Sequence, residues 1–431
     1  MEYISLIGIL VALTIIVIGS IRGLNLIILS SVATFIVLAT GGVAVIDNYT
    51  TTYMGSVGES VTSLFPLFLG GQLFGKLLDK SGLTESLAIN IVKKVGTKAI
   101  VTAVYIVSWV LVAAGVNVFV IIFTVYPLAV SFFKLAGIPR SLIPACVLGA
   151  AVSNQTLPGM TNNSNIVPTE ALGVPATAGP VIGILGCILL AVMNLWYLNY
   201  AAKKAVAAGE GFKEREGENI QIDMAKTDMP NPLMVIPPLA VVFILLNVVR
   251  LPAYAALYCG AVVLLVMFFS RYGGIKGIFE ALNDAAKGST SVVSTSAIVG
   301  FASVVAVVPG YELIQTVLTK ASSGNPYLYA AIAVAVIAGV SGSATGGIKF
   351  VLAEFSDKLL AMGANPSSLS RVMTMASLTF DSLPHNSAIV LTLNYCGVTH
   401  KEGYKHVFFT TVLATLVSAA MGIVLASMGI C

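Results

Sequence analysis

Residues 140–170 read RSLIPACVLGAAVSNQTLPGMTNNSNIVPTE, and they set the kind of fold to expect. An apolar run typical of a helix leads into Pro158 and Gly159, which lie among amides and hydroxyls. Inside a lipid bilayer a helix is broken in this way only where protein or a water-filled cavity satisfies the freed backbone groups. If the flanking sequence crosses a membrane, this segment is therefore a broken helix at a polar site inside the protein.

The composition places the flanking sequence in a membrane. Of 431 residues, 57% are hydrophobic and only 10% are charged, whereas soluble globular proteins have about 25% charged residues. Apolar runs long enough to cross a hydrocarbon core of about 30 Å recur along the chain. They lack the strict alternation of barrel strands. We therefore predict an all-α polytopic membrane protein, which excludes a nucleic-acid partner and makes the lipid bilayer the main one.

The chain divides into two halves of similar size. A polar linker at 201–231 separates residues 1–200 from residues 232–431. The first half has a small-residue interruption near 115–117, then the broken helix at 140–170; the second has one at 341–347, then a polar, proline-containing segment within 368–396. Paired interruptions of this kind are typical of transporters built from inverted repeats. We expect about five transmembrane helices and one re-entrant hairpin in each half, with hairpins at about 99–135 and 327–361.

Charge predicts the orientation. Most Lys and Arg residues fall in segments that this layout places on the linker side, and cytoplasmic loops are rich in these residues. We therefore expect a multi-pass inner-membrane protein with a cytoplasmic linker and both termini outside. Two spanning helices at 99–135 are the alternative to a hairpin. We also expect one spanning helix at 288–312.

The two broken helices and the second hairpin tip carry the candidate binding residues. Amides and hydroxyls offer both donors and acceptors, which suit a carboxylate, substrate hydroxyls or a sodium ion. A helix N-terminus after the tip favours an anion, and Lys349 adds a positive charge. The candidate substrate ligands are Asn117, Ser153, Asn154, Thr156, Thr161, Asn162, Asn163, Ser343, Thr345, Lys349, His385 and Asn386.

Ionisable side chains inside a membrane mark ion or substrate paths. Asp381 and His385 lie in the segment TFDSLPHNS at 379–387. We expect Asp381, Ser382 and His385 to couple transport to an ion, with a possible sodium site near Asn154, Asn163 and Asp381. The blander interpretations are a surface loop, a local Asp–His pair and a lysine that reaches the interface. We expect no cofactor and no resident metal.

Three segments resemble the gluconate permease family, which belongs to a larger superfamily with the citrate and dicarboxylate carriers. They are GGQLFGKLLD at 70–79, SNQTLPG at 153–159 and TMASLTFDSLPH at 374–385. The first broken helix is rich in Asn and Thr where typical members have His and Pro, and it is similar to sodium-binding segments of the dicarboxylate carriers. The resemblance implies uptake of small monocarboxylates such as sugar acids or hydroxy acids, a homodimer and elevator-like movement.

Three function classes follow from these observations. The first is symport of a small organic monocarboxylate with a proton or sodium ion. The second is a sodium/proton antiporter of the same superfamily, for which Asp381 is the titrating candidate. The third is a membrane enzyme or a structural subunit, which we do not expect because the sequence has no catalytic motif.

Overall fold

The computed structural model describes residues 1–113, 118–160, 162–215, 228–249, 251–320 and 324–431. Within these ranges the chain is helical, and six helices are long and apolar enough to cross a membrane. The prediction of an all-α polytopic membrane protein is confirmed. The six candidate spans are Glu2–Ile21, Val45–Lys80, Val118–Leu135, Pro180–Ala207, Gly274–Val305 and His400–Ser427.

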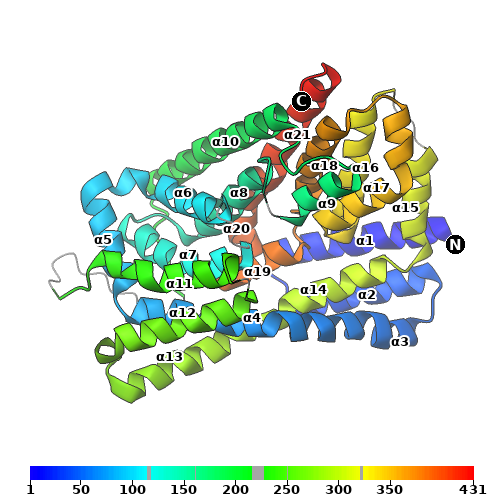
Figure 1. The fold of residues 1–431 in the computed structure, drawn as a ribbon. Coiled ribbons are helices and arrows are strands. Elements are labelled where there is room, and N and C mark those ends of the chain that lie inside the picture. The colour runs from blue at the N-terminus through cyan, green and yellow to red at the C-terminus, as the bar shows by residue number, and fades with distance from the viewer. Residues whose placement is uncertain (114–117, 161, 216–227, 250, 321–323) are drawn as a thin grey trace.

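The described residues of the first half form ten α-helices (Figure 1). A π-helical turn at Tyr49–Tyr53 joins α3 to α4, so that the two form one long span. The helices are α1 (Glu2–Ile21), α2 (Leu26–Gly41), α3 (Val45–Asn48), α4 (Met54–Lys80), α5 (Leu83–Val95), α6 (Ile100–Ala113), α7 (Val118–Leu135), α8 (Ile143–Gln155), α9 (Asn163–Ala171) and α10 (Pro180–Ala207).

The second half repeats this order of elements. In both halves, two apolar helices precede a long helix built of two pieces, an amphipathic helix, a two-legged hairpin, a broken helix and a final long helix. The helices are α11 (Ile236–Asn247), α12 (Ala253–Met267), α13 (Gly274–Ser289), α14 (Val292–Val305), α15 (Pro309–Lys320), α16 (Pro326–Ser341), α17 (Ala344–Ala361), α18 (Pro366–Phe380), α19 (Ser387–Cys396), α20 (His400–Val407) and α21 (Ala414–Ser427).

The expected span at 288–312 is wrong in its boundaries. The long helix starts earlier, because α13 and α14 together run from Gly274 to Val305. Pro309 then starts α15, a separate amphipathic helix with Glu312 in its first turn. Proline favours the first turn of a new helix because it has no N–H to leave unpaired there. The prediction from hydropathy joined the end of α14 to the start of α15 in one span.

The two halves interlock through their first helices. In the first half, α1 packs on α15 and α2 packs on α14; in the second half, α12 packs on α4. One buried apolar cluster therefore joins Ile9, Val37 and Phe301, and another joins Phe74 and Leu257. All three buried apolar clusters contain residues of both halves, so the fold is one intertwined body.

Asparagine followed by proline begins three segments of the second half. Asn325 and Asn365 accept hydrogen bonds from backbone N–H groups in the first turns of α16 and α18, and Asn231 does so before Pro232. An asparagine at the N-cap satisfies N–H groups that the helix leaves unpaired, and proline at the first helical position removes one. These dipeptides therefore fix where the second hairpin and the second broken helix start.

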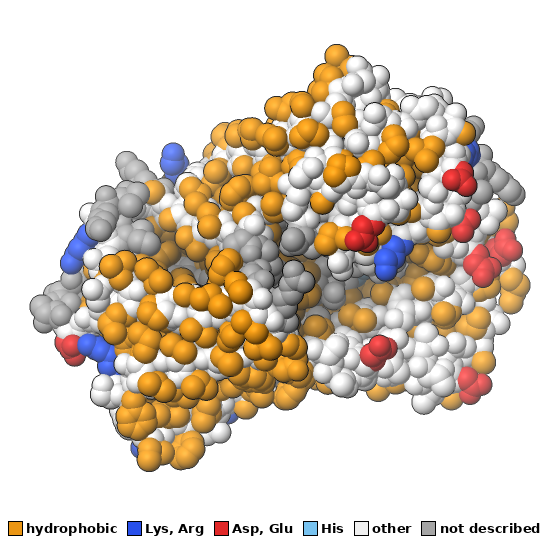
Figure 2. Space-filling view, in the orientation of Figure 1, with side chains coloured by type: hydrophobic (Ala, Val, Ile, Leu, Met, Phe, Trp, Pro, Cys, Tyr) orange, Lys and Arg blue, Asp and Glu red, His pale blue; other side chains and the backbone are white. Residues whose placement is uncertain are grey.

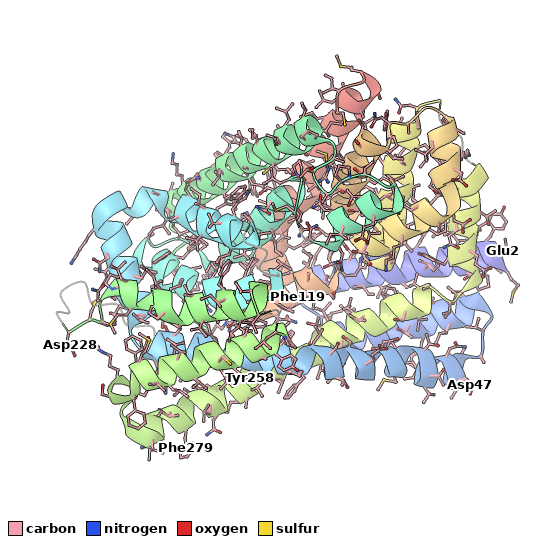
Figure 3. All side chains as sticks on the ribbon, viewed as in Figure 1. Glu2, Asp47, Phe119, Asp228, Tyr258 and Phe279 are labelled. Atoms are coloured by element: carbon pink, nitrogen blue, oxygen red, sulfur yellow. The ribbon has the colours of Figure 1, made fainter. Side chains whose placement is uncertain are left out.

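The first legs of the two hairpins are short for a bilayer, whereas the second legs, α7 and α17, have 18 residues each and α7 is one of the six candidate spans. Helix α6 has 14 residues and α16 has 16, or about 21 and 24 Å at 1.5 Å per residue, against a hydrocarbon core of about 30 Å. Figure 3 places Phe119, at the start of α7, in the middle of the molecule, between Asp228 at one end and Glu2 and Asp47 at the other. The start of α7 therefore lies midway along the molecule, and the re-entrant hairpin at 99–135 stays a prediction.

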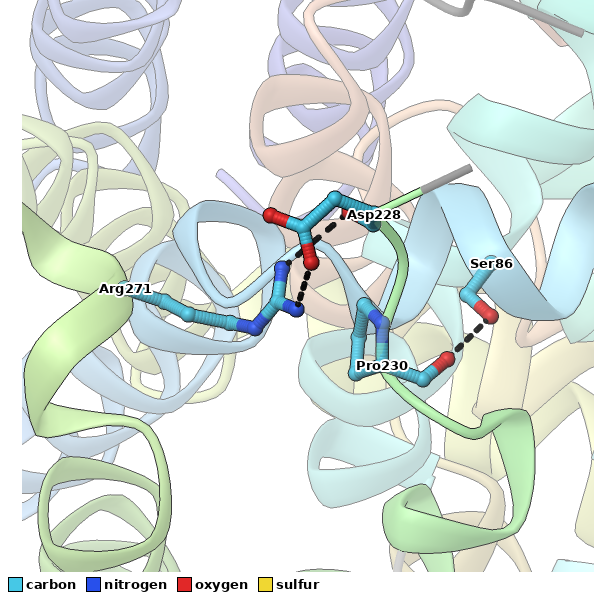
Figure 4. Close-up of polar contacts among 4 residues, drawn as sticks. All are labelled: Ser86, Asp228, Pro230 and Arg271. Carbon is cyan, nitrogen blue, oxygen red and sulfur yellow. Dashed lines mark hydrogen bonds and ion pairs between the residues drawn. The ribbon is translucent and has the colours of Figure 1, made fainter. Parts of the chain in front are cut away.

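The described parts of the linker are fastened to one end of the molecule. Arg271 donates to Asp228 Oδ1 at 2.7 Å, and Ser86 on α5 donates to Pro230 O at 2.6 Å (Figure 4). At the other side of the linker, Glu214 pairs with Lys134 and Arg215 donates to Tyr395 O. The linker thus has fixed attachment points on α5, α7 and α19 and beside α13.

Basic and acidic side chains gather at opposite ends of the molecule. On the face drawn in Figure 2, most Lys and Arg side chains lie at the left end, where the linker leaves the bundle, and most Asp and Glu side chains lie at the right end. Between the two ends, hydrophobic side chains cover much of this face. This apolar belt is the surface that lipid would cover.

Candidate functional site

The first broken helix is interrupted at residues 156–162, called the first break below. Helix α8 ends at Gln155 and α9 begins at Asn163. Gly159 lies between them with φ of +80°, and its N–H donates to Ala176 O at 2.8 Å. A positive φ is readily adopted by glycine alone. Pro158 and Gly159 therefore do locally what the sequence implied: they end one helix and turn the chain into the next.

The second broken helix is interrupted at residues 381–386, the second break. Asn386 organises it with both ends of its amide. Its Oδ1 accepts from Ala388 N at 2.7 Å and from Ile389 N at 3.2 Å, which caps α19. Its Nδ2 donates to Asp381 Oδ1 at 2.9 Å and to Gly342 O at 3.0 Å. One side chain thereby ties the acidic residue to the second hairpin tip.

Each break is hydrogen-bonded to the hairpin of its own half. Asn154, just before the first break, donates from Nδ2 to Trp109 O on α6 at 3.3 Å. His385, in the second break, donates from Nε2 to Gly339 O on α16 at 2.8 Å. Both acceptors lie near the end of the first hairpin leg. The same relation between break and hairpin therefore occurs twice.

Three buried polar atoms at the breaks have no hydrogen-bond partner among the described residues. They are Asn154 Oδ1, Asn162 Nδ2 and His385 Nδ1. Leaving such an atom unsatisfied costs about 1–3 kcal/mol, so each has a reason to meet a ligand or water. Asn154 offers an acceptor and Asn162 a donor. Because Gly339 O can only accept, His385 Nε2 carries a hydrogen, and Nδ1 accepts in the neutral ring and donates in the protonated one.

Four other predicted residues support the architecture. Ser153 Oγ lies 2.8 Å from Tyr105 Oη, and Thr156 Oγ1 donates to Ser153 O at 2.8 Å. Ser343 Oγ accepts from Gly346 N at 3.1 Å and caps α17. The carbonyl of buried Ser382 accepts from Tyr404 Oη at 3.1 Å. The bonds of Thr156, Ser343 and Ser382 lie at the ends of helices, and the contact of Ser153 joins α8 to α6.

The remaining predicted residues make none of the contacts above or fall outside the residues that the structure describes. Lys349 on α17 and Asn163 at the start of α9 are exposed, whereas Thr345 is half-buried. Asn154 is fully buried, and the sodium site near Asn154, Asn163 and Asp381 stays a prediction. Among the described residues there is also no group of three or more His, Cys, Asp or Glu side chains able to hold a metal. Asn117 and Thr161 lie outside the described residues.

Arg371 is the main residue of the site that the sequence interpretation missed. It counted only as one of the few charges outside the linker side, yet its side chain is fully buried in α18 and hydrogen-bonds to the first break. Asn165, which accepts from Arg371 and donates to Asn162 Oδ1, belongs to the same contact. The available signal was an arginine inside a helix that otherwise lacks charge, just before the second break.

The comparisons with known proteins are consistent with this arrangement. No family model matches the sequence. The chain is 29% identical to the "Uncharacterized transporter YxjC" of Bacillus subtilis (strain 168), over 95% of this chain and 96% of that protein. It is 22% identical to an "Uncharacterized transporter" of Haemophilus influenzae, over 82% of each. Along most of its length, this chain is therefore similar to proteins named as transporters.

A solved structure also aligns with the chain. The Alcanivorax borkumensis YdaH transporter is 17% identical and covers 86% of this chain and 87% of its own, with a TM-score of 0.38. A score this low establishes no shared fold. None of the three names mentions gluconate, so the resemblance to gluconate permeases stays a prediction.

Proposed function

We propose that this protein is a secondary transporter that carries a small organic monocarboxylate, such as a sugar acid or hydroxy acid, in symport with a proton or a sodium ion. The observation that carries the proposal is the set of unpartnered polar atoms at the two breaks, on Asn154, Asn162 and His385. Discontinuous helices with free polar groups are where transporters of this architecture bind their substrates. The names of the two relatives support transport as the activity.

The chemistry of these atoms favours a hydroxylated carboxylate. The Asn162 amide would donate to a carboxylate oxygen, and Asn154 Oδ1 and Nδ1 of neutral His385 would accept from substrate hydroxyls. Amides and imidazole bind an anion without a fixed charge, so that the substrate can leave again. The exposed Lys349 is not needed at the break in this proposal.

Asp381 is the proposed coupling group. It is the acidic side chain of the second break, and Asn386 holds one of its oxygens at 2.9 Å. A carboxylate in this setting binds either a proton or, with neighbouring carbonyl oxygens, a sodium ion. The same observation favours the second candidate, a sodium/proton antiporter in which Asp381 is the exchanged site.

The wider architecture belongs to the proposal. The repeated order of elements and the matched contacts, α4 with α12 and α14 with α2, support two inverted repeats. The Lys and Arg residues at the linker end support a cytoplasmic linker and external termini in an inner membrane. A homodimer and elevator-type movement rest on the resemblance to gluconate permeases.

The test is uptake by purified protein in proteoliposomes. The substrates are radiolabelled gluconate, glycerate, lactate, 3-hydroxybutyrate and D-serine, each with an imposed proton gradient or an imposed sodium gradient. We expect concentrative uptake of one anion under one gradient, abolished by dissipating that gradient. Protein-free vesicles and Asp381→Asn protein are the controls.

Two results would overturn the symport proposal. The first is no accumulation of any of these anions by folded, correctly inserted protein. The second is a pH-dependent sodium flux that no organic solute alters, which would support the antiporter.

A further inference from the structure

Arg371 joins α18 of the second half to the first break in the other half. It is fully buried. Its guanidinium donates to Leu157 O at 3.3 Å, to Ala176 O at 3.1 Å and to the side-chain oxygen of Asn165. Leu157 lies in the break, Asn165 on α9, and Ala176 in the loop before α10. One side chain therefore touches each segment that shapes the first break.

The chemistry of the contact suits arginine in particular. The guanidinium carries five donors in a rigid plane, whereas lysine has a single ammonium on a flexible stem. Thr156 and Leu157 follow the last turn of α8, where carbonyl groups lack helical partners and attract a positive charge. Arg371 also faces Thr156 O at 3.5 Å. Lysine would satisfy fewer of these carbonyls at once.

The backbone makes room for this arginine. Gly179, before α10, has φ of +61°, and a Cβ placed on it would lie 2.3 Å from Arg371 Cγ and 2.9 Å from Ser367 O. Any larger residue there would displace the arginine. Gly173 in the same loop has φ of +65° but nothing within 4 Å of such a Cβ. The two glycines thus share a conformation and differ in their contact with Arg371.

The contact differs from an ordinary packing interaction. Among the described residues, the hydrogen-bond partners of Arg371 are neutral oxygens, and its Nε has none. Burial of a cation is unfavourable unless hydrogen bonds and nearby negative charge offset it, and a charge interaction with Cys431 favours the guanidinium. The hydrogen bonds that Arg371 makes nevertheless all go to segments that shape the first break.

We propose that Arg371 is a positioning residue that holds the first break, with Asn154 and Asn162, in its ligand-binding shape from the opposite half of the chain. The effect on ligand binding rests on the function proposed above, but the effect on the shape of the break does not. The two can therefore be tested separately.

The first experiment measures the break itself and needs no substrate. In protein whose five native cysteines are replaced, a single cysteine is introduced at Met160 in the first break or at Leu383 in the second. Both positions are half-buried. Labelling by a membrane-permeant maleimide is then compared with and without Arg371→Lys. We expect labelling at 160 to rise about tenfold, as loss of hydrogen bonds to a charged group implies, with no change at 383.

Two matched pairs control this result. Thr374→Val removes one hydrogen bond from α18 to Ser164 O, 2.8 Å long, and leaves the arginine in place. Gly179→Ala displaces Arg371 and also presses on the backbone of α18 at Ser367, whereas Gly173→Ala introduces a similar backbone strain without either contact. We expect Arg371→Lys and Gly179→Ala to raise labelling at 160, and Thr374→Val and Gly173→Ala to leave it near the parent level.

The second experiment is uptake of the anion identified above. We expect Arg371→Lys to raise the half-saturating substrate concentration about tenfold, with protein of normal monodispersity. Unchanged labelling at 160 would overturn the proposal whatever happens to uptake, and so would an equal rise at 160 and 383, which indicates general loosening. If no anion is transported even by the parent protein, the proposed function fails while labelling still decides the role of Arg371.

Discussion

The two breaks occupy equivalent places in the chain but are held in opposite ways. The second break is fixed within its own half: Asn386 and His385 bond to the second hairpin, and His400 donates to Pro384 O at 3.0 Å. The first break receives Asn154 from its own half but Arg371 from the other. A repeated architecture thus carries an asymmetric set of contacts.

Chemistry follows the same asymmetry. When the two segments are aligned on Leu157-Pro158 and Leu383-Pro384, Gln155 occupies the place in the first half that Asp381 occupies in the second. The second break therefore has the acidic group and an imidazole, whereas the first has amides. We infer a division of labour between the breaks. The second break, which is held by its own half, binds the coupling ion, and the first break, which Arg371 holds from the other half, contributes neutral substrate ligands.

The largest expected effect comes from Asp381. Asp381→Asn keeps the size of the side chain but removes the charge, so we expect coupled uptake to fall at least about 100-fold, or about 2.7 kcal/mol at 1.36 kcal/mol per factor of ten. Initial rates in proteoliposomes measure this. Glu354→Gln on α17, a charged residue away from both breaks, is the control and should transport normally. Full activity of Asp381→Asn would remove the basis for assigning the ion to the second break.

Asn154 should show an intermediate effect. Asn154→Ala deletes both the unpartnered Oδ1 and the bond to Trp109 O. We expect the half-saturating substrate concentration to rise about tenfold, in keeping with the loss of one or two neutral hydrogen bonds, and the dependence on the coupling ion to stay unchanged. A shift in ion dependence equal to that of an Asp381 variant would contradict the division of labour.

Replacement of Asn386 should have the smallest effect on uptake of the three and should clearly lower thermal stability. Asn386→Ala removes the cap of α19 and the link to Gly342 O, and loss of an N-cap costs about 1 kcal/mol. Thermal unfolding in detergent should therefore begin at a lower temperature. Asn365→Ala, which removes the cap of α18 away from the breaks, is the matched variant. Equal effects of both on stability, with reduced uptake in Asn386→Ala alone, would support this assignment.

Local sequence signals predicted much of the fold. Hydropathy indicated the helical membrane class, and Pro158 with Gly159 marked the place where α8 and α9 separate. The small residues at 341–347 marked the second hairpin, whose turn is at Gly342 with φ of +64°. Signals of this kind depend on neighbouring residues, so one sequence suffices to see them.

Contacts between distant segments could not be predicted in the same way. Arg371 looked like a surface charge because nothing near it in sequence announces Thr156, Asn165 or Ala176 as partners. Lys349 follows a glycine-rich turn and is exposed on α17, and its role as an anion ligand stays a prediction. The start of α15 was lost because apolar residues on both sides of Pro309 hide the boundary in a hydropathy average.

The fastened linker has a consequence for how the halves find one another. The described parts of the linker are anchored independently, by Glu214 and Arg215 in its first part and by Asp228 and Pro230 near its end. The specificity of assembly lies in the buried faces, where α2 meets α14 and α4 meets α12. The linker then raises the effective concentration of one half near the other and does not fix how they pack. Two fragments produced together and separated between residues 215 and 228 would keep all the described contacts between the halves, so we expect them to assemble into a complete protein.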